Sequence, residues 1–137
     1  MRQHARVRNC TFIRIILMLS ILDLTGCAST HDDGDGFNPL GGGMSSYKVS
    51  EGIYHIYERT NYAPWKNFSG ARSAWQSKAE ALCGSKLIRE LGIKEYTFEN
   101  IGAAYIHTIK EGYAICEGVK LSDEEVQAVI DGNSGIK

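Results

Sequence analysis

A short apolar run near the N-terminus decides how much of this 137-residue chain can fold as a domain. The run covers only Ile15–Leu22, and four basic residues precede it: Arg2, Arg6, Arg8 and Arg14. A membrane-spanning helix needs roughly 20 apolar residues, and Asp23, directly after the run, would be costly in hydrocarbon. A basic segment followed by a short apolar run is typical of a signal peptide. The pattern therefore predicts a signal peptide over residues 1–26, which takes no part in the fold.

The residues after this run resemble the lipobox of bacterial lipoproteins. Leu24-Thr25-Gly26-Cys27 has an apolar residue, two small residues and a cysteine in the order of that family. The resemblance implies that Cys27 carries a palmitate-bearing lipid and is the attachment point to the membrane. Ala28 stands where an acidic residue would retain a lipoprotein in the inner membrane, so the resemblance implies outer-membrane sorting, with the chain facing the periplasm. The alternative is an ordinary secretory peptide with a cysteine nearby by chance.

Two of the four cysteines remain once the N-terminal segment is assigned. Cys10 leaves with the signal peptide and Cys27 is taken by the lipid, which leaves Cys83 and Cys116. In an oxidising periplasm such a pair most simply forms a disulfide, and a loop of this length would stabilise the domain by roughly 3–4 kcal/mol. A redox or catalytic pair is the alternative, but it usually needs a Cys-x-x-Cys motif at a helix start.

Residues 27–46 are expected to form a flexible tether, because Ser, Thr, Asp and Gly predominate and no apolar period is present. Asp32, Asp33 and Asp35 form an acidic cluster, but the further ligands and the distal Glu of a calcium loop are missing. We therefore expect no metal ion and no other cofactor. The folded domain is expected to cover residues 47–131, followed by a loose tail over 132–137.

Strand and helix patterns divide the first half of this domain. Tyr47–Val49 and Ile53–Glu58 are rich in aromatic and β-branched residues, which predicts a strand or hairpin. A long helix is predicted from Ser69, as its N-cap, to Leu91, because apolar residues recur at three- and four-residue steps. Gly92 would end this helix as its C-cap. Gly84 lies inside it and costs roughly 1 kcal/mol relative to alanine, so either the helix breaks there or a neighbour packs closely on it.

The second half of the domain is predicted to contain three strands and a short helix. Lys94–Phe98 is predicted to be a strand. Ala103–Ile109 and Tyr113–Glu117 are predicted to form a hairpin around the turn at residues 110–112. Ser122 and Glu125 form a capping box for a last helix that ends at Ile130.

This element order predicts an α+β fold. The expected architecture is a small antiparallel sheet with one long helix packed on one face and a short C-terminal helix. Cys83 lies on the apolar side of the long helix, and Cys116 alternates with Ala114 on the last strand. The disulfide would therefore join the helix to a strand.

Candidate catalytic or metal-binding groups are few. His55 and His107 lie on predicted strands without a nearby spaced partner. A Cys2His2 zinc site that combines them with Cys83 and Cys116 would draw every ligand from a separate element, whereas zinc sites generally use close pairs. A Cys-His nucleophile pair has no supporting local motif either. We expect no catalytic residue and no enzyme activity.

Six aromatic side chains lie within 22 residues and form the best candidate for a binding surface. They are Tyr47, Tyr54, Tyr57, Tyr62, Trp65 and Phe68. Tyrosine and tryptophan combine a large contact area with a polar group, as recognition surfaces require. Strand alternation sends Tyr54 and Tyr57 to opposite faces, so part of the set belongs to the core. The possible binding patch consists of whichever side chains are exposed among Tyr54, Tyr57, Tyr62 and Trp65.

The formal net charge of −1 argues against nucleic acid as a partner, because phosphate recognition brings a basic surplus. Over roughly residues 46–118, the element order and the two cysteines are similar to those of small proteobacterial envelope lipoproteins. We expect a lipid-anchored, non-catalytic periplasmic protein that binds an envelope protein or glycan, as sensors, assembly accessories and immunity lipoproteins do. The alternatives are a small periplasmic enzyme and a glycan-contacting envelope scaffold.

Overall fold

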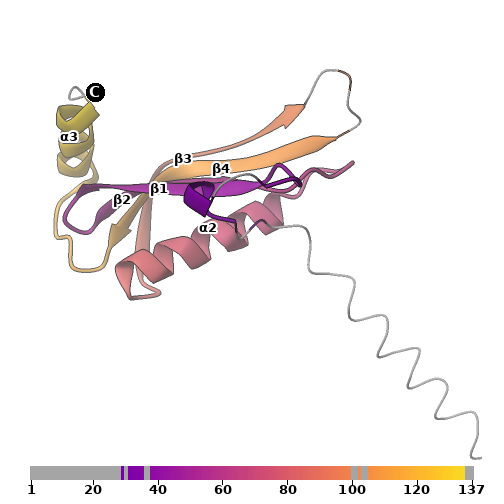
Figure 1. Cartoon of the computed structure of the whole chain (residues 1–137). Coiled ribbons are helices and arrows are strands. Elements are labelled where there is room, and N and C mark those ends of the chain that lie inside the picture. The colour runs from indigo at the N-terminus through magenta and orange to yellow at the C-terminus, as the bar shows by residue number, and fades with distance from the viewer. Residues whose placement is uncertain (1–28, 30, 36–37, 100–101, 103–104, 135–137) are drawn as a thin grey trace, which may run out of the picture.

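The computed structural model describes residues 29, 31–35, 38–99, 102 and 105–134 (Figure 1). The predicted signal peptide and the lipobox with Cys27 lie outside these residues, and so do residues 135–137 of the predicted tail. Within the described part of the chain, no helix is both long and apolar enough to cross a membrane.

Four antiparallel strands form one sheet, and two helices lie against it (Figure 1). The strands, whose order across the sheet is β1-β2-β4-β3, are β1 (Gly43–Ser50), β2 (Ile53–Arg59), β3 (Ile88–Glu99) and β4 (Ile106–Cys116). The helices are α2 (Phe68–Cys83), α3 (Asp123–Ser134) and the short 3₁₀ helix η1 (Asp33–Asp35). The predicted α+β fold, with a long helix on one face and a short C-terminal helix, is confirmed.

Helix α2 covers one face of the sheet, which we name the closed face. Its core consists of Ile56 from β2, Trp75 and Ala79 from α2, and Ala114 from β4, all fully buried. The Trp75 indole Nε1 donates a hydrogen bond to the backbone oxygen of Ile56 at 3.1 Å. The largest side chain of this core therefore buries its ring while its one polar atom is paired.

Helix α3 covers only one end of the opposite face. Ile53 and Ile115 are paired across β2 and β4, and they pack against Val126 and Ile130 of α3. Because side chains alternate along a strand, Ile53 and Ile56 point to opposite faces of the sheet. We name the part of this face that α3 leaves uncovered the open face.

The predicted disulfide joins Cys83 and Cys116, the last residues of α2 and β4. Their Cα atoms lie 5.3 Å apart, within the usual 4.4–6.8 Å range. The bond connects the helix layer to the sheet layer, as the sequence predicts.

Helix α2 is shorter than expected, because it ends at Cys83 rather than at Leu91. Gly84 adopts a left-handed backbone conformation, with φ 64°, and its N–H donates to the Glu80 carbonyl at 2.8 Å. This is a common glycine C-cap. Ile88 and Leu91, two apolar residues that follow, belong to β3 instead. At the other end Asn67, and not Ser69, is the N-cap, since its side chain accepts a hydrogen bond from the Gly70 N–H at 3.0 Å.

The predicted hairpin around residues 110–112 is wrong, because β4 runs unbroken from Ile106 to Cys116. Gly112 lies opposite a register shift in β3, between Leu91 and Lys94. A side chain at Gly112 would overlap Ile93 and would place its Cβ 3.2 Å from the backbone oxygen of Leu91. This glycine therefore permits close approach of two backbones across an irregular pair of strands, and it does not form a turn.

The folded part begins before Tyr47. Strand β1 starts at Gly43, and the Met44 N–H donates to the His31 backbone oxygen at 2.8 Å. Asp32 pairs with Lys78 of α2 at 3.0 Å. Residues 38–46 and the described residues before them therefore pack on the domain rather than forming a tether.

At the C-terminal end, the predicted capping box of α3 is confirmed. The Ser122 N–H donates to Glu125 Oε2 at 2.8 Å, and the Glu125 N–H donates to Ser122 Oγ at 3.3 Å. The helix continues past Ile130 to Ser134, so the first residues of the predicted loose tail are helical.

Candidate functional site

The open face carries many of the exposed aromatic side chains of the described chain. Tyr47, Tyr96, Phe98 and Tyr105 are between 40% and 57% exposed. The His55 ring stacks on Tyr47, with 4.9 Å between ring centroids. A folded domain rarely leaves so many neighbouring rings in water unless they contact something else.

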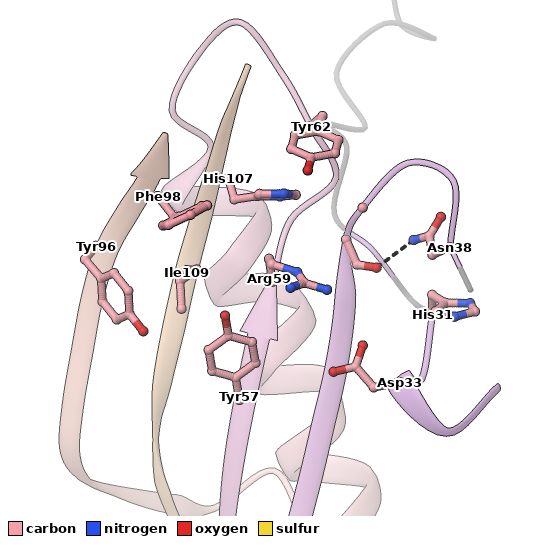
Figure 2. A pocket seen from close by; sticks show the side chains of 12 residues that line it. His31, Asp33, Asn38, Tyr57, Arg59, Tyr62, Tyr96, Phe98, His107 and Ile109 are labelled. Carbon is pink, nitrogen blue, oxygen red and sulfur yellow. Dashed lines mark hydrogen bonds between the residues drawn. The ribbon is translucent and has the colours of Figure 1, made fainter. Parts of the chain in front are cut away.

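A cavity of about 530 Å³ opens beside two of these rings, Tyr96 and Phe98 (Figure 2). Its lining comes from β2, β3 and β4, from the described residues before β1 and from the segment after β2. The lining residues are His31, Asp33, Asn38, Gly41, Gly42, Tyr57, Arg59, Tyr62, Tyr96, Phe98, His107 and Ile109. This volume suits a small molecule or one chemical group of a larger ligand.

The strand register explains why distant residues meet in this cavity. Arg59 of β2 is paired with Ile109 of β4, which is paired in turn with Tyr96 of β3. Phe98 of β3 lies opposite His107 of β4, two residues from the pair of Tyr96 and Ile109 on each strand. Alternate residues point to one face, so all five side chains belong to the open face.

The remaining wall comes from the segment that was expected to be a tether. The Asn38 Nδ2 donates to the Gly42 carbonyl at 2.6 Å, and the Tyr62 N–H donates to the Leu40 carbonyl at 2.9 Å. Gly41 has φ 74°, and any side chain there would overlap the Tyr62 ring. The backbone of this segment therefore packs directly against the aromatic ring that borders the cavity.

Arg59 places a cationic group in the cavity. Figure 2 draws its guanidinium among Tyr57, Asn38 and Asp33. The Nε atom is buried without a hydrogen-bond partner, and none of the ion pairs within the described residues includes Arg59. A buried donor without a partner costs about 1–3 kcal/mol. The arrangement is suited to an acceptor group that a ligand would supply.

His107 forms another part of the wall as a neutral ring. Its Nδ1 lies 2.7 Å from the Thr60 backbone oxygen, and because a carbonyl only accepts, Nδ1 carries the proton. Burial lowers the pKa of His107, the Thr60 hydrogen bond raises it, and the positive charge of Arg59 lowers it. The Tyr62 ring covers the imidazole, with 3.9 Å between centroids.

Glu58 lies between two cavity residues in sequence but points the other way. Its side chain is fully buried toward the closed face. Burial raises the pKa of this carboxyl to about 8, and the carboxylate of Asp33 adds to the shift. Glu58 is therefore protonated at neutral pH and belongs to the core rather than to the cavity.

The structure separates the four residues of the predicted binding patch. Tyr57 and Tyr62 line the cavity, whereas Tyr54 packs against the core of the closed face. Trp65 is 57% exposed but is not part of the lining. The role of these residues in binding stays a prediction.

His55 and His107 are not brought together, since only His107 reaches the cavity, while His55 stacks on Tyr47 and contacts Tyr113 edge to face. Cys83 and Cys116 are used in the disulfide, so neither is available as a zinc ligand. Among the described residues, no group of three His, Cys, Asp or Glu side chains is placed to hold a metal ion.

Sequence reasoning missed Arg59, Asn38 and the two β3 aromatics, Tyr96 and Phe98. Arg59 could have been found, because it follows Tyr57 by two residues and so shares its face. The contribution of β3 depends on its pairing with β4, which no local pattern reveals. Comparison with protein-family models, with curated proteins and with solved structures finds no match to this chain.

Proposed function

We propose that this protein is a lipid-anchored, non-catalytic binding protein of the bacterial envelope, which receives an envelope component on its open face. The observation that carries the proposal is the contrast between the two faces of one sheet. The closed face is filled by α2, while the open face keeps exposed rings around a cavity that holds the Arg59 guanidinium, whose buried Nε has no hydrogen-bond partner among the described residues. This combination suits a recognition surface.

The anchor is argued from the sequence alone. The lipobox resemblance assigns the lipid to Cys27 and the location to the outer membrane, with the domain in the periplasm. Labelled palmitate should enter the wild-type chain, and Cys27→Ser should abolish the labelling, because that residue supplies the attachment thiol. Undiminished labelling of the variant would refute the anchor.

Binding is tested by photo-crosslinking in the native envelope. A photoreactive residue at Phe98, on the open face, should give a defined adduct. The matched control is Leu87, which is 64% exposed against 57% for Phe98 but lies outside the cavity lining. A defined adduct from Phe98 and none from Leu87 would support the proposal. No adduct from Phe98, or equal adducts from both positions, would contradict it.

A small periplasmic enzyme is the second candidate, and one observation favours it. His107 lines the cavity with its Nδ1 proton held by Thr60, which leaves Nε2 as a proton acceptor. His107→Asn discriminates between the two candidates, because the amide can still donate to Thr60 but is not a base. If the Phe98 adduct forms in this variant in the same yield and with the same mass as in the wild type, binding is supported. If the variant instead captures more of the component than the wild type, and captures it intact where the wild type captures a cleaved form, turnover is supported.

A further inference from the structure

Two opposite charges line the cavity but do not form an ion pair with each other. The Arg59 guanidinium and the Asp33 carboxylate are both part of the lining, yet none of the ion pairs in the described chain joins them. A Cβ at Gly43 would overlap the Asp33 carboxylate and would lie 3.6 Å from the Arg59 Nη2. The missing side chain at Gly43 thus leaves room for the Asp33 carboxylate beside the cavity, on the side where Arg59 also lies.

The charge of Asp33 acts inside the cavity region. It raises the pKa of the Tyr57 hydroxyl, after the larger effect of burial and those of Tyr96 and Glu111. It also raises the pKa of Glu58, on the other side of the strand. A ligand group at this position therefore meets a negative field from Asp33 and a positive one from Arg59.

Aromatic rings form the walls around these charges. Tyr57, Tyr62, Tyr96 and Phe98 all line the cavity. Faces of such rings attract cations such as ammonium groups, and they also cover the apolar carbons between two charged groups. A ligand with an anionic end, a short apolar spacer and an ammonium end would match this arrangement.

The sequence places this cavity close to the membrane anchor. His31 and Asp33 line the cavity, and His31 follows Cys27 by only four residues. A chain of four residues spans at most about 14 Å. With a lipid on Cys27, the backbone of His31 at the cavity wall would lie within that distance of the Cα of the lipid-bearing residue.

We infer that the cavity binds the headgroup of a zwitterionic phospholipid, with the phosphodiester on Arg59 and the ammonium beside Asp33. The guanidinium provides parallel N–H donors that match phosphate oxygens. The inference rests on the proposed function, because the anchor at Cys27 is what brings the cavity to the lipid surface. The open face would then hold the domain against the membrane that carries it.

The direct test is a titration of the full-length protein, purified in a sugar-based detergent, with glycerophosphoethanolamine, followed by NMR shifts or by heat. We expect saturable binding that glycine does not reproduce, since a free amino acid has a carboxylate too close to its ammonium. Ethanolamine and glycerol 3-phosphate, which each carry one of the two charges, should bind more weakly.

Variants of the two charged residues should both weaken binding of glycerophosphoethanolamine, but by different amounts. Arg59→Gln should weaken binding of glycerophosphoethanolamine about tenfold or more, the effect of losing a charge-assisted pair. The affinity of Arg59→Lys should lie between those of the wild type and Arg59→Gln, because lysine keeps the charge and loses the planar group. Asp33→Asn should weaken glycerophosphoethanolamine about two- to fivefold and strengthen glycerol 3-phosphate, whose charge it no longer repels.

The matched controls are Lys86→Gln and Asp35→Asn, which change the same charges at exposed positions outside the lining. Neither should alter the affinity, and thermal melting of each variant reports whether it is folded. The inference would be overturned if the wild type did not bind glycerophosphoethanolamine or bound glycine equally well. It would also be overturned if the Arg59→Lys and Asp33→Asn variants were both folded and kept the affinity of the wild type. If the titration fails while Phe98 still cross-links an envelope component, the headgroup inference falls and the proposed function stands.

Discussion

The two faces of the sheet are built by alternate residues of the same strands, yet they differ in what covers them. On the closed face, Ile56 and Ala114 are fully buried beneath Trp75 of α2. On the open face, Tyr96 and Phe98 are 40% and 57% exposed around the cavity. The exposed rings of the open face therefore contribute little to stability compared with the buried side chains beneath α2.

The largest expected effect is on the closed face. Trp75→Ala should lower the free energy of unfolding by about 3–5 kcal/mol, because it empties the space under the sheet and removes the hydrogen bond to Ile56. Trp65→Ala is the control, since that indole is 57% exposed and its loss should stay within about 0.5 kcal/mol. Urea unfolding measures both. Equal losses of unfolding free energy in the two variants would contradict the expected difference between buried and exposed aromatic residues.

The second-largest loss of stability is expected from removal of the disulfide, since it joins the helix of the closed face to the sheet. Replacing Cys83 and Cys116 together by alanine should cost about 2–5 kcal/mol. Urea unfolding of oxidised wild type, reduced wild type and the double variant measures the loss, and the last two should agree. Two freely alkylated thiols in denatured, unreduced protein purified from its native host would eliminate the bond.

The pH dependence of unfolding tests Glu58, the buried acid of the closed face. Its pKa is raised from 4.5 to about 8, so the folded state holds a proton that the unfolded state releases between these values. The contribution of Glu58 to stability therefore falls as pH rises from about 4.5 to about 8. Glu58→Gln should remove this decline and should raise stability at pH 8 by about 1–3 kcal/mol.

The control for this prediction is Glu99→Gln, which changes an exposed glutamate of β3. It should leave the slope of stability against pH as it is in the wild type. Unfolding curves recorded at several pH values provide the measurement. A slope that survives in Glu58→Gln would show that another group is responsible for it.

The smallest effect on stability is expected on the open face. Phe98→Ala should change the free energy of unfolding by no more than about 0.5 kcal/mol, because more than half of this ring is exposed to water. The variant should nevertheless reduce capture of the proposed envelope component, measured by the yield of an adduct from a photoreactive residue at Tyr96. Full capture together with unchanged stability would mean that the functional surface lies elsewhere on the domain.

Features decided by neighbouring residues could be predicted from the sequence. The capping box of Ser122 and Glu125 involves one helical turn, and the opposite faces of Tyr54 and Tyr57 follow from the geometry of a strand. The break at Gly84 was visible as one of two alternatives, because glycine reaches the left-handed conformation without a steric cost. The disulfide followed from the two cysteines that remain outside the predicted signal peptide and lipid site.

Features decided by contacts between distant segments required the tertiary structure. Gly112 looks like a turn residue in the sequence, but its role is set by Ile93 on the neighbouring strand. Residues 38–42 look like a tether, yet hydrogen bonds and the Tyr62 ring hold them against the domain. The sequence by itself determined the fold class and the helix and strand types, because these depend on local periodicity. The cavity around Arg59 was decided only by strand register and by the docking of that segment, because residues far apart in the chain meet there.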